Sequence, residues 1–571
     1  MPLLSKGWLM AVNYKIDSIR SGSYGSDRHA AWYEGRPWVS HYPAFMQRDI
    51  DIAPDATILA LMRRACVEYS DRVAFELGSE RLTYGEWLKR SDALARFFVR
   101  EWGLNAGDRI IFLLPNVTAF PVALLAAWTA NLVIVPMLTA TTAHEFVDPI
   151  ADAEPKAIVG LDVLMDNFRG APNAAGVREL VVPAPQTLFG DAPPQPSHAV
   201  LFDNAVAAGA KLEPIERSVG PNDLALLQYT GGTTGVSKAV MTTQRNMVAE
   251  VEMLRMAVHE YARPEPDLVI SVHPFFHSAG MSVNLLHYSS NGATHLLFPK
   301  SKSAEHVVEG WRGRDVTSIL AGPAFYHALL DVPGFETLDF SALRAGFVGG
   351  MPLRPDIRER WERITGRPLV EGYGLTELAG PITAQMGSGH RTASVGFPLP
   401  SIELTIRHED GSAVPPGEHG EIWLRGPCLM PGYYKHPTET ARTITDDGWF
   451  RTGDIGYMDA DGHLYLVSRI KDIVIVGSVN VYPSEVEAAV GAHPGVADVC
   501  AVGMPDRASG ERVRLFVVRS DPGLDTAAVS TWCAERLSDY KCPKRIDFVD
   551  ALPRSAVGKV LRRELCNRPY E

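Results

Sequence analysis

The sequence has few cysteines, and their arrangement excludes several classes of protein. Its 571 residues include six cysteines, which are scattered and form no Cys-x-x-Cys pair. A secreted domain held by disulfides and a zinc site with regular cysteine or histidine spacing are therefore excluded. Residues 1–15 have a lysine within their only apolar stretch and no small-residue cleavage site, so they do not predict a signal peptide. We expect the protein in a reducing cytoplasm.

The sequence also lacks an excess of basic residues. Acidic residues outnumber basic ones, 67 to 55, and the formal net charge is −12. A nucleic-acid-binding domain needs a basic surface to meet the phosphate backbone. We therefore expect no nucleic-acid partner. The hydrophobic share of 46% is that of an ordinary globular chain, and the length predicts two or more domains.

One long uncharged run is present, but it does not have the composition of a membrane span. Residues 120–138 contain no charged side chain, and Pro121, Asn131 and Pro136 interrupt them. From Leu132 onward the run is rich in β-branched residues. We therefore predict a buried helix followed by a buried strand.

The first half of the chain predicts a layered α/β fold. Residues 57–69 and 81–103 have the apolar spacing of amphipathic helices, and residues 108–115 have the pattern of a buried strand that ends at a proline. Such alternation predicts largely parallel sheets covered by helices. Residues 182–200 are rich in proline and small residues, which predicts a surface connection.

The pattern changes after about Glu409. Asp-Gly and Pro-Gly turns separate short segments, which predicts a β subdomain with antiparallel strands. Beyond Lys471 we predict strands at 472–477, 496–503 and 512–519, and helices at 483–493 and 525–537. We therefore expect a large N-terminal domain over residues 1–470 and a small α+β domain over residues 471–571.

A glycine-rich segment, YTGGTTGVSKAV at residues 229–240, follows an apolar stretch. It is not a Walker phosphate loop, because Lys238 lies between Ser237 and Ala239 rather than after a glycine. Glycines nevertheless let backbone N–H groups approach an anion, and the hydroxyl groups and Lys238 add donors and a positive charge. We therefore predict a phosphate-binding loop of another kind.

Four further segments carry residues suited to nucleotide chemistry. They are EGYGLTEL (371–378), with Thr376 and Glu377; WFRTGDIGY (449–457), with Asp454; SRIKDIVIVGSVNVYPSEVE (468–487); and LPRSAVGKVLRREL (552–565), with Lys559. A carboxylate such as that of Glu377 suits Mg²⁺, which prefers oxygen ligands. Asp454 is expected on a glycine-containing turn, where its carboxylate can accept hydrogen bonds from two ribose hydroxyls.

In this order and spacing, the five segments resemble the AMP-forming acyl-CoA synthetase family, which includes luciferases and the adenylation domains of peptide synthetases. Within it, the sequence is most similar to bacterial long-chain fatty acid CoA ligases. The resemblance runs from EGRPWVSHYP (34–43) through GPCLMPGYYKHPTETA (426–441) to the C-terminal motif. It implies the adenylate-forming ligase fold, in which a large α/β domain and a β subdomain precede a small mobile C-terminal domain.

The resemblance implies a two-step reaction. A carboxylate attacks the α-phosphate of MgATP to give an acyl-adenylate and pyrophosphate, and the thiol of coenzyme A then displaces AMP. The implied phosphate-binding residues are Thr230, Gly231, Gly232, Thr233, Thr234, Gly235 and Lys238, and the implied adenine-binding residues are Gly349, Gly350 and Tyr373. Thr376 would bond the α-phosphate, Glu377 would hold Mg²⁺, Asp454 and Arg469 would bind the ribose, and Lys559 would bridge the carboxylate and α-phosphate oxygens.

The resemblance also implies that the small domain rotates about a hinge at Lys471 between the two steps. The sequence departs from the family pattern at two places. Ser237-Lys238-Ala239 replaces a common Pro-Lys-Gly, which leaves the donors and the charge in place. Ser478-Val479 precede Asn480 where the family usually has a glycine two residues before the asparagine, and Gly477 comes earlier. Because that glycine borders the pantetheine tunnel, CoA and a carrier protein both remain open as the final acceptor.

The acid is predicted from FFHSAGMSVNLLHYSS, residues 275–290, which resembles the acyl-pocket region of the family. The segment is apolar and small enough for an alkyl chain, so a medium- or long-chain fatty acid is the first expectation. His277 is expected to contact the substrate, and His273 to be a core histidine. The alternatives are an aryl- or other carboxylate-CoA ligase, and a fatty acyl-AMP ligase that passes its product to a carrier protein.

A regulatory or scaffold protein without activity is disfavoured, because the residues that the resemblance implies for catalysis are all present. A homodimer is compatible with the sequence. So is peripheral contact with a membrane that supplies a lipid substrate.

Overall fold

The computed structural model describes residues 29–185, 196–230, 237–258, 266–299, 304–351, 353–386, 391–476, 479–506, 509–555 and 558–569. The chain divides into two compact units. Unit 1 consists of Met1–Ser40, Glu403–Leu424 and Trp449–Glu571, and unit 2 of His41–Ile402 and Arg425–Gly448. The mobile domain expected to begin at Lys471 stays a prediction.

Unit 2 contains two largely parallel sheets. Among the described residues the first has seven strands in the order β7-β6-β5-β3-β4-β8-β9. These are β3 (Arg109–Leu113), β4 (Val133–Pro136), β5 (Ala157–Leu161), β6 (Arg178–Val182), β7 (Val200–Leu201), β8 (Leu224–Thr230) and β9 (Lys238–Thr243). All neighbouring strands are parallel except β8 and β9, which form an antiparallel pair.

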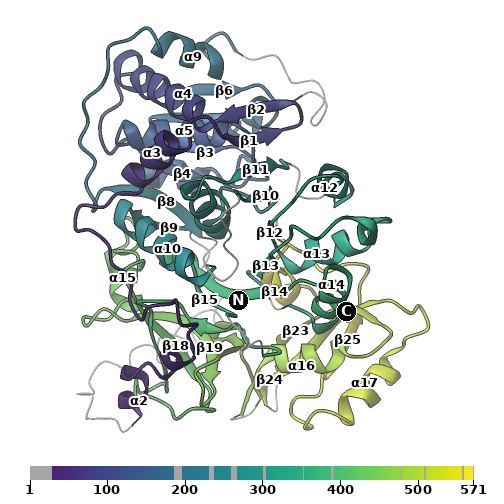
Figure 1. Ribbon diagram of the computed structural model, residues 1–571. Coiled ribbons are helices and arrows are strands. Elements are labelled where there is room, and N and C mark those ends of the chain that lie inside the picture. The colour runs from purple at the N-terminus through teal and green to yellow at the C-terminus, as the bar shows by residue number, and fades with distance from the viewer. Residues whose placement is uncertain are drawn as a thin grey trace, which may run out of the picture. The chain divides into compact units, whose positions relative to one another are not determined.

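Helices accompany this sheet, and several of them lie beside it in Figure 1. They are α3 (Ile58–Glu68), α4 (Tyr84–Arg96), α5 (Ala119–Thr129), α6 (Val147–Ala153), α7 (Met165–Arg169), α9 (Phe202–Gly209) and α10 (Gln244–Ala257), with the 3-10 turn η3 (Asp162–Leu164). Residues 119–128 of α5 are all buried, and β4 follows. The prediction of a buried helix and strand over residues 120–138 is confirmed. In the part of the chain that is described, no helix has both the length and the apolar character to cross a membrane.

The second sheet of unit 2 has nine strands within the described ranges, in the order β16-β15-β14-β13-β12-β10-β11-β1-β2. They are β1 (Val73–Leu77), β2 (Glu80–Thr83), β10 (Leu268–Ser271), β11 (Thr294–Leu297), β12 (Ser318–Ala321), β13 (Ala345–Gly349), β14 (Leu369–Leu375), β15 (Gly380–Ala384) and β16 (Phe397–Pro398). The stretch from β14 to β1 is parallel, and antiparallel pairs form both edges.

The helical elements that follow in unit 2 include a π-helix. They are η5, the π-helix (Gly280–His287), α11 (Tyr288–Ser290), α12 (Ala304–Trp311), α13 (Pro323–Leu330), η6 (Phe335–Thr337), α14 (Pro355–Thr365), η7 (Thr376–Leu378) and α15 (Pro437–Thr443). A core that includes Trp311, Tyr326 and Trp361 joins α12, α13 and α14 to the strands. Burial of these large rings fixes the sheet that carries the candidate site residues.

Local capping explains where two of the helices begin. Thr83 accepts a hydrogen bond from the Glu86 amide and Glu86 bonds back, so α4 starts at Tyr84 with a capping box. The helix predicted over residues 81–103 therefore begins later, because residues 80–83 pair with β1 as strand β2. Its last turn, η2 (Phe97–Glu101), is a π-helix, which apolar spacing does not distinguish from an α-helix. Thr243 and Asn246 form the same box at the start of α10.

Unit 1 contains a sheet in the order β17-β18-β19-β20, in which β19 pairs antiparallel with both β18 and β20. Its strands are β17 (Glu403–Arg407), β18 (Gly420–Arg425), β19 (Phe450–Met458) and β20 (Leu464–Arg469). The N-terminal elements α2 (Ala30–Glu34) and η1 (Pro37–His41) precede them in the chain, and the Tyr33 hydroxyl donates to the Val414 carbonyl at 3.0 Å. This sheet is the β subdomain that the Asp-Gly and Pro-Gly turns predicted.

The remainder of unit 1 is an α+β arrangement with its own core. Its elements are η8 (Ile470–Asp472), β21 (Val474–Val476), β22 (Val479–Val481), α16 (Pro483–Gly491), β23 (Val496–Asp506), β24 (Gly510–Arg519), α17 (Thr526–Ala534), β25 (Arg545–Phe548) and α18 (Arg562–Cys566). Buried valines from the strands and from α16 and α17 fill the core. The strands and helices predicted here are present, and β25, which pairs with β24 in parallel, was not predicted. The α/β fold class is confirmed.

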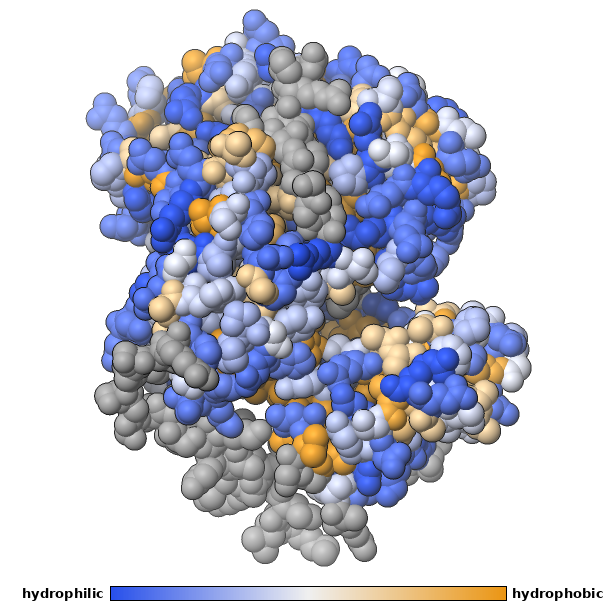
Figure 2. Space-filling view, turned by 60° about the horizontal axis from the view of Figure 1, so that its bottom comes forward, coloured by the Kyte–Doolittle hydropathy of each residue, from blue (hydrophilic) through white to orange (hydrophobic). Residues whose placement is uncertain are grey.

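The surface is mainly polar where it can be seen. On the face drawn in Figure 2, hydrophilic residues cover most of the area and hydrophobic residues form small groups. All six cysteines are free thiols; Cys566 is exposed, Cys542 is half-buried, and the others are buried. Membrane contact and a dimer stay predictions.

Candidate active site

The two ends of the predicted phosphate loop are fixed by strand pairing. Thr230 ends β8, Lys238 begins β9, and the two residues are Cα partners in the antiparallel ladder. The Ser237 hydroxyl donates to the Thr230 carbonyl at 3.2 Å, and the Thr230 hydroxyl donates to the Lys238 carbonyl at 3.4 Å. Gly231, Gly232, Thr233, Thr234 and Gly235 lie outside the described residues.

Lys238 forms an ion pair that the sequence did not reveal. Its Nζ lies 2.6 Å from Oε2 of Glu439, which is on α15, and the two side chains are 16% and 27% exposed. The hydrogen bond from Lys238 lowers the pKa of the Glu439 carboxyl, and Arg442 pairs with the same carboxylate at 2.7 Å. Because 201 residues separate Lys238 from Glu439, no local pattern signals the pair.

Glu377 is held by the segment that precedes α15. It lies on η7, directly after β14, and its backbone carbonyl accepts a hydrogen bond from the Met430 amide at 2.8 Å. The Tyr433 hydroxyl donates to Oε1 of Glu377 at 3.0 Å. Burial first, and then the Glu377 charge, raise the pKa of Tyr433, which keeps the phenol protonated as a donor. Tyr433 is thus a further site residue that sequence analysis had not singled out.

The residues predicted to meet the adenine lie on the neighbouring strands. Gly349 at the end of β13 pairs with Gly372 on β14, one residue before Tyr373, which is 7% exposed. A Cβ at Gly349 would stand 3.0 Å from the Gly372 carbonyl oxygen, so the strand pairing itself favours glycine there. Gly350 has a φ of +81°, a conformation that side chains other than glycine rarely adopt. Contact of these residues with adenine stays a prediction.

His277 lies on a turn beside the strand that leads to the phosphate loop. Its amide donates to the Pro274 carbonyl at 3.0 Å, and Gln228 on β8 donates to the Phe276 carbonyl at 2.9 Å. The His273 Nε2 and His277 Nδ1 atoms are 3.4 Å apart. Unit 2 therefore brings the His277 turn next to β8, which ends at Thr230.

Asp454 and Arg469 form a pair in unit 1. They are Cα partners on β19 and β20, and the Arg469 Nε lies 2.8 Å from Oδ1 of Asp454. Asp454 is only 5% exposed. The expectation of a turn at this position was wrong, because residues 450–458 pair as strand β19 on both sides. Gly453 supplies the local irregularity, with a φ of +70°.

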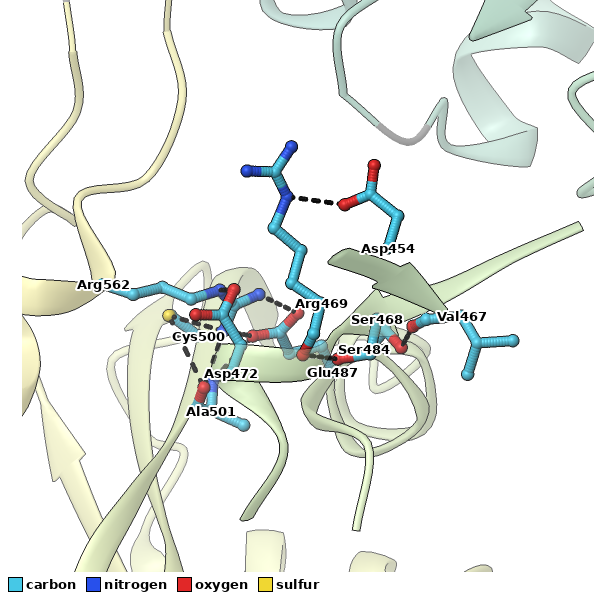
Figure 3. A network of polar contacts seen from close by, with 10 residues as sticks. All are labelled: Asp454, Val467, Ser468, Arg469, Asp472, Ser484, Glu487, Cys500, Ala501 and Arg562. Carbon is cyan, nitrogen blue, oxygen red and sulfur yellow. Dashed lines mark hydrogen bonds and ion pairs between the residues drawn. The ribbon is translucent and has the colours of Figure 1, made fainter. Parts of the chain in front are cut away.

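The predicted hinge is tied to the segment that carries Lys559. Lys471 lies on η8, and the carboxylate of the next residue, Asp472, is 3.8 Å from the Arg562 guanidinium. Arg562 also donates to the Glu487 carboxylate and to the Ala501 carbonyl, at 2.6 Å each. Figure 3 shows this network together with the Asp454–Arg469 pair. All of these residues belong to unit 1.

Lys559 lies beside a short antiparallel bridge. Arg554 and Val560 form an isolated antiparallel bridge, and the Ser555 amide donates to the Lys559 carbonyl at 2.7 Å. The Lys559 amide donates to the Ser555 hydroxyl at 3.1 Å, and Gly558 has a φ of +86°. The Lys559 residue is exposed. The backbone of Lys559 is thus held by its bonds with Ser555, on a residue that lies at the surface.

A group of potential metal ligands lies elsewhere in unit 1. Ligand atoms of Asp459, Asp461 and His463 lie within 4.8 Å of one another, in the connection between β19 and β20. Asp459 Oδ1 accepts hydrogen bonds from the amides of Asp461 and His463, both at 3.0 Å. These bonds close the turn between the strands, so the group has a structural role.

The candidate residues offer two kinds of electrostatic partner. Lys238, Arg469 and Lys559 are cations suited to phosphate and carboxylate groups. Glu377 offers carboxylate oxygens, the ligand type that Mg²⁺ prefers, and the Tyr433 hydroxyl orients them. Lys238 and Glu377 lie in unit 2, whereas Asp454, Arg469, Lys471 and Lys559 lie in unit 1. Cations and a potential Mg²⁺ ligand of this kind can offset negative charge in a reaction between anionic groups.

Known proteins resemble the chain over nearly its whole length. The family of AMP-binding enzymes matches residues 62–434, and the AMP-binding enzyme C-terminal domain matches residues 485–559. The chain is 34% identical to a long-chain-fatty-acid–CoA ligase of Escherichia coli O6:H1, over 92% of this chain and 97% of that protein. It is 32% identical to the feruloyl-CoA synthase of Amycolatopsis sp, over 86% and 94%. The structure of ATP-bound MatB from Rhodopseudomonas palustris, 30% identical, superposes with a TM-score of 0.77 and covers 89% of this chain and 98% of that one.

Proposed function

The chain belongs to the family of AMP-binding enzymes, and from this premise we propose that it converts a carboxylic acid into a thioester through an acyl-adenylate. The acid is a medium- or long-chain fatty acid, and the thiol is that of coenzyme A. The observation that carries the proposal is the 34% identity to a long-chain-fatty-acid–CoA ligase, which extends over 97% of that protein. The structure of ATP-bound MatB supports ATP as the co-substrate.

In the first step, a carboxylate oxygen of the acid attacks the α-phosphorus of ATP. The bond from that phosphorus to the bridging oxygen breaks, and pyrophosphate leaves. Thr230 and Lys238 bind the phosphates in this proposal, Thr376 bonds the α-phosphate, and Lys559 supplies positive charge where the two anions meet. Asp454 and Arg469 hold the ribose through hydroxyl groups, and Tyr373 stacks on the adenine.

Glu377 fits a role in holding Mg²⁺. Its carboxylate provides the oxygen atoms that this ion prefers, and the Tyr433 hydrogen bond fixes one of them. When bound with ATP, the ion offsets the negative charge of the phosphates. The chain's own contribution is to orient the carboxylate through Tyr433 and through the bond between Met430 and the Glu377 carbonyl.

In the second step, the sulfur of coenzyme A attacks the acyl carbon, and AMP leaves with the electron pair of the carbon–oxygen bond. Rotation about Lys471 separates the two steps in this proposal, because the first needs Lys559 and the second needs access for the thiol. The similarity to a feruloyl-CoA synthase supports a second candidate, in which the acid is an aryl acid. Transfer of the acyl group to a carrier protein is the other alternative to CoA.

The reaction class is tested by product analysis over a panel of fatty and aryl acids. We expect AMP and pyrophosphate to form only when acid, ATP and Mg²⁺ are all present. Product formation that requires CoA for turnover supports the CoA ligase, and adenylate that accumulates with or without CoA supports transfer to a carrier protein. Detection of ADP and phosphate as the main products would overturn the proposed function.

Release of Lys238 from Glu439 is expected to strengthen ATP binding. Because a partly exposed ion pair contributes up to about 1 kcal/mol, Glu439→Gln should lower the KM for ATP by up to about fivefold. Steady-state kinetics with varied ATP measure this. Arg442→Gln is the matched control, since it removes the other cation that pairs with Glu439 and leaves the Lys238 contact in place. A higher KM in Glu439→Gln would instead show that the pair prepares Lys238 for binding.

A further inference from the structure

Helix α10 carries a buried carboxyl group, that of Glu250, for which the described residues offer no hydrogen-bond partner. Glu250 is 0% exposed. Among the described residues, no group forms a hydrogen bond with either oxygen of its side chain. Burial raises the pKa of Glu250 well above its usual range, which favours the protonated, neutral form of the carboxyl group. A buried polar group without a partner is costly, and few persist in folded proteins without a reason.

Small and polar groups from three other segments surround the Glu250 carboxyl. A Cβ at Gly380, the first residue of β15, would stand 2.4 Å from the Ser282 Oγ and 2.5 Å from the Glu250 Oε1. Both oxygen atoms therefore converge on the backbone of Gly380. The segment that contains Cys428 is bonded to α10 through Asn246, and burial is the main cause that raises the pKa of the Cys428 thiol. We call Glu250, Ser282, Gly380 and Cys428 the α10 polar cluster.

Hydrogen bonds hold the segment that contains Cys428 against helix α10. Asn246, one turn before Glu250 on α10, donates from Nδ2 to the carbonyls of Pro427 and Leu429 at 2.9 and 3.0 Å. Cys428 lies between these two residues. Ser282 donates its hydroxyl to the Ser278 carbonyl at 3.0 Å, which leaves the oxygen lone pairs of Ser282 available to accept. The cluster is thus built from fixed elements.

Each element of the α10 polar cluster continues directly from a candidate site residue of unit 2. Helix α10 follows β9, which begins at Lys238, and η5 begins three residues after His277, in the segment expected to form the acyl pocket. Strand β15 follows η7, which carries Glu377. Met430, two residues after Cys428, bonds the Glu377 carbonyl. The elements that carry the cluster therefore adjoin the residues that are proposed to bind ATP and the acid.

The chemistry of the cluster differs from that of a pocket for a plain alkyl chain. An alkyl chain offers no hydrogen bond, so an aliphatic side chain in place of Glu250 would serve it better. A protonated carboxyl group has one O–H donor and one acceptor oxygen. A hydroxyl group is the simplest ligand that matches both, since it donates once and accepts as well. The Ser282 oxygen adds a second acceptor.

We propose that Glu250, with Ser282, hydrogen-bonds a hydroxyl group that the acid substrate carries away from its carboxylate, so that the preferred substrates are hydroxylated acids. This rests on the proposed function and specifies its substrate class. The discrimination arises because an acid without the hydroxyl leaves the buried carboxyl group without a partner. A cationic substituent is not preferred, because the neutral carboxyl group offers it no charge.

The test compares kcat/KM for pairs of acids that differ only in a hydroxyl group. The probes are dodecanoic acid and its hydroxy derivatives with the hydroxyl at different carbons, and cinnamic and 4-hydroxycinnamic acid. Dodecanoic acid with a terminal amino group is the cationic probe. We expect the wild-type protein to prefer at least one hydroxylated member by about tenfold or more over its parent acid.

Substitutions attribute this preference to the cluster. Glu250→Leu should abolish it by lowering kcat/KM for the hydroxylated acid and raising it for the parent acid. Glu250→Gln, which keeps a donor and an acceptor, should retain part of the preference, and Ser282→Ala should reduce it. Glu252→Leu is the matched control on the same helix, because the Glu252 carboxylate already pairs with Arg255 at 3.0 Å; its ratio of kcat/KM values should equal that of the wild type.

The outcomes separate this inference from the proposed function. If no acid of the panel yields AMP and pyrophosphate, the proposed function fails. If the parent acids react but no hydroxylated acid is preferred over its parent, the inference fails and the proposed function stands. The same conclusion follows if dodecanoic acid with a terminal amino group is the preferred substrate. Equal losses for both acids of a pair in Glu250→Leu, with a lowered melting temperature, would show that Glu250 is only a structural residue. Glu250→Gln then serves as the better-folded variant for the same comparison.

Discussion

Lys559→Ala is expected to slow adenylate formation on the order of 100-fold or more, by comparison with the loss of one donor that stabilises a transition state. The reason is that Lys559 is proposed to supply charge only where the carboxylate meets the α-phosphate. The second half-reaction, from supplied acyl-adenylate and CoA, should be nearly unaffected. Pyrophosphate release measures the first step, and AMP release from preformed adenylate measures the second.

Two controls make the Lys559 result specific. Arg563→Ala removes a cation from an exposed position four residues further along, and it should leave both steps intact. The backbone of Lys559, and not its side chain, makes the hydrogen bonds with Ser555, so Lys559→Ala should retain the native melting temperature. Equal losses in both half-reactions would contradict a role confined to adenylation.

Glu377→Gln should also reduce adenylation on the order of 100-fold or more, because it removes the charge proposed to hold the metal ion while keeping the shape of the side chain. The amide oxygen can still accept the hydrogen bond from Tyr433, so the fold should be preserved. The rate of pyrophosphate release is measured against Mg²⁺ concentration. A higher requirement for Mg²⁺ is expected to accompany the loss.

Tyr433→Phe provides the comparison for Glu377. It removes the donor at 3.0 Å but leaves the carboxylate, so we expect a loss of about tenfold, the effect of one partly buried hydrogen bond to a charged group. If Glu377→Gln has a normal Mg²⁺ dependence and a lowered melting temperature, the carboxylate stabilises the fold and does not bind Mg²⁺.

The sequence predicted those parts of the fold and site that depend on local pattern. The length of the uncharged run at residues 120–138 and the β-branched residues in its second part predicted a helix followed by a strand. The structure contains both, as α5 and β4. The motif residues Asp454 and Arg469 were expected to act together, and strand pairing does bring them into an ion pair. The prediction of a turn at Asp454 was wrong because a glycine inside a paired strand and a glycine in a turn look alike in the local sequence.

The contacts that sequence analysis missed join distant segments. Tyr433 and Glu377 are 56 residues apart, and Lys238 and Glu439 are 201 apart. No periodicity reports such pairs, because they depend on how sheets and loops pack rather than on local conformation. Glu250 illustrates the same point, since its position on a helix with apolar neighbours does not reveal that neither carboxyl oxygen has a hydrogen-bond partner among the described residues.

The Arg562 network also offers a place for a label that would test the proposed rotation about Lys471. Arg562 joins Asp472, beside the predicted hinge, to Glu487 and Ala501, and it lies three residues after Lys559 and four before the exposed thiol of Cys566. Cys566 is the exposed member of the six cysteines and hence the preferred position for a maleimide fluorophore, and a mildly alkaline pH favours the reaction because burial raises the pKa of its thiol. Arg562 is the first residue of α18, and its bonds anchor this helix to β23 through Ala501 and to α16 through Glu487. A label on Cys566 therefore follows the orientation of this α+β part of unit 1 and not the motion of a loose tail. A second dye placed in unit 2 would convert that orientation into an energy-transfer signal that can be followed through a single turnover.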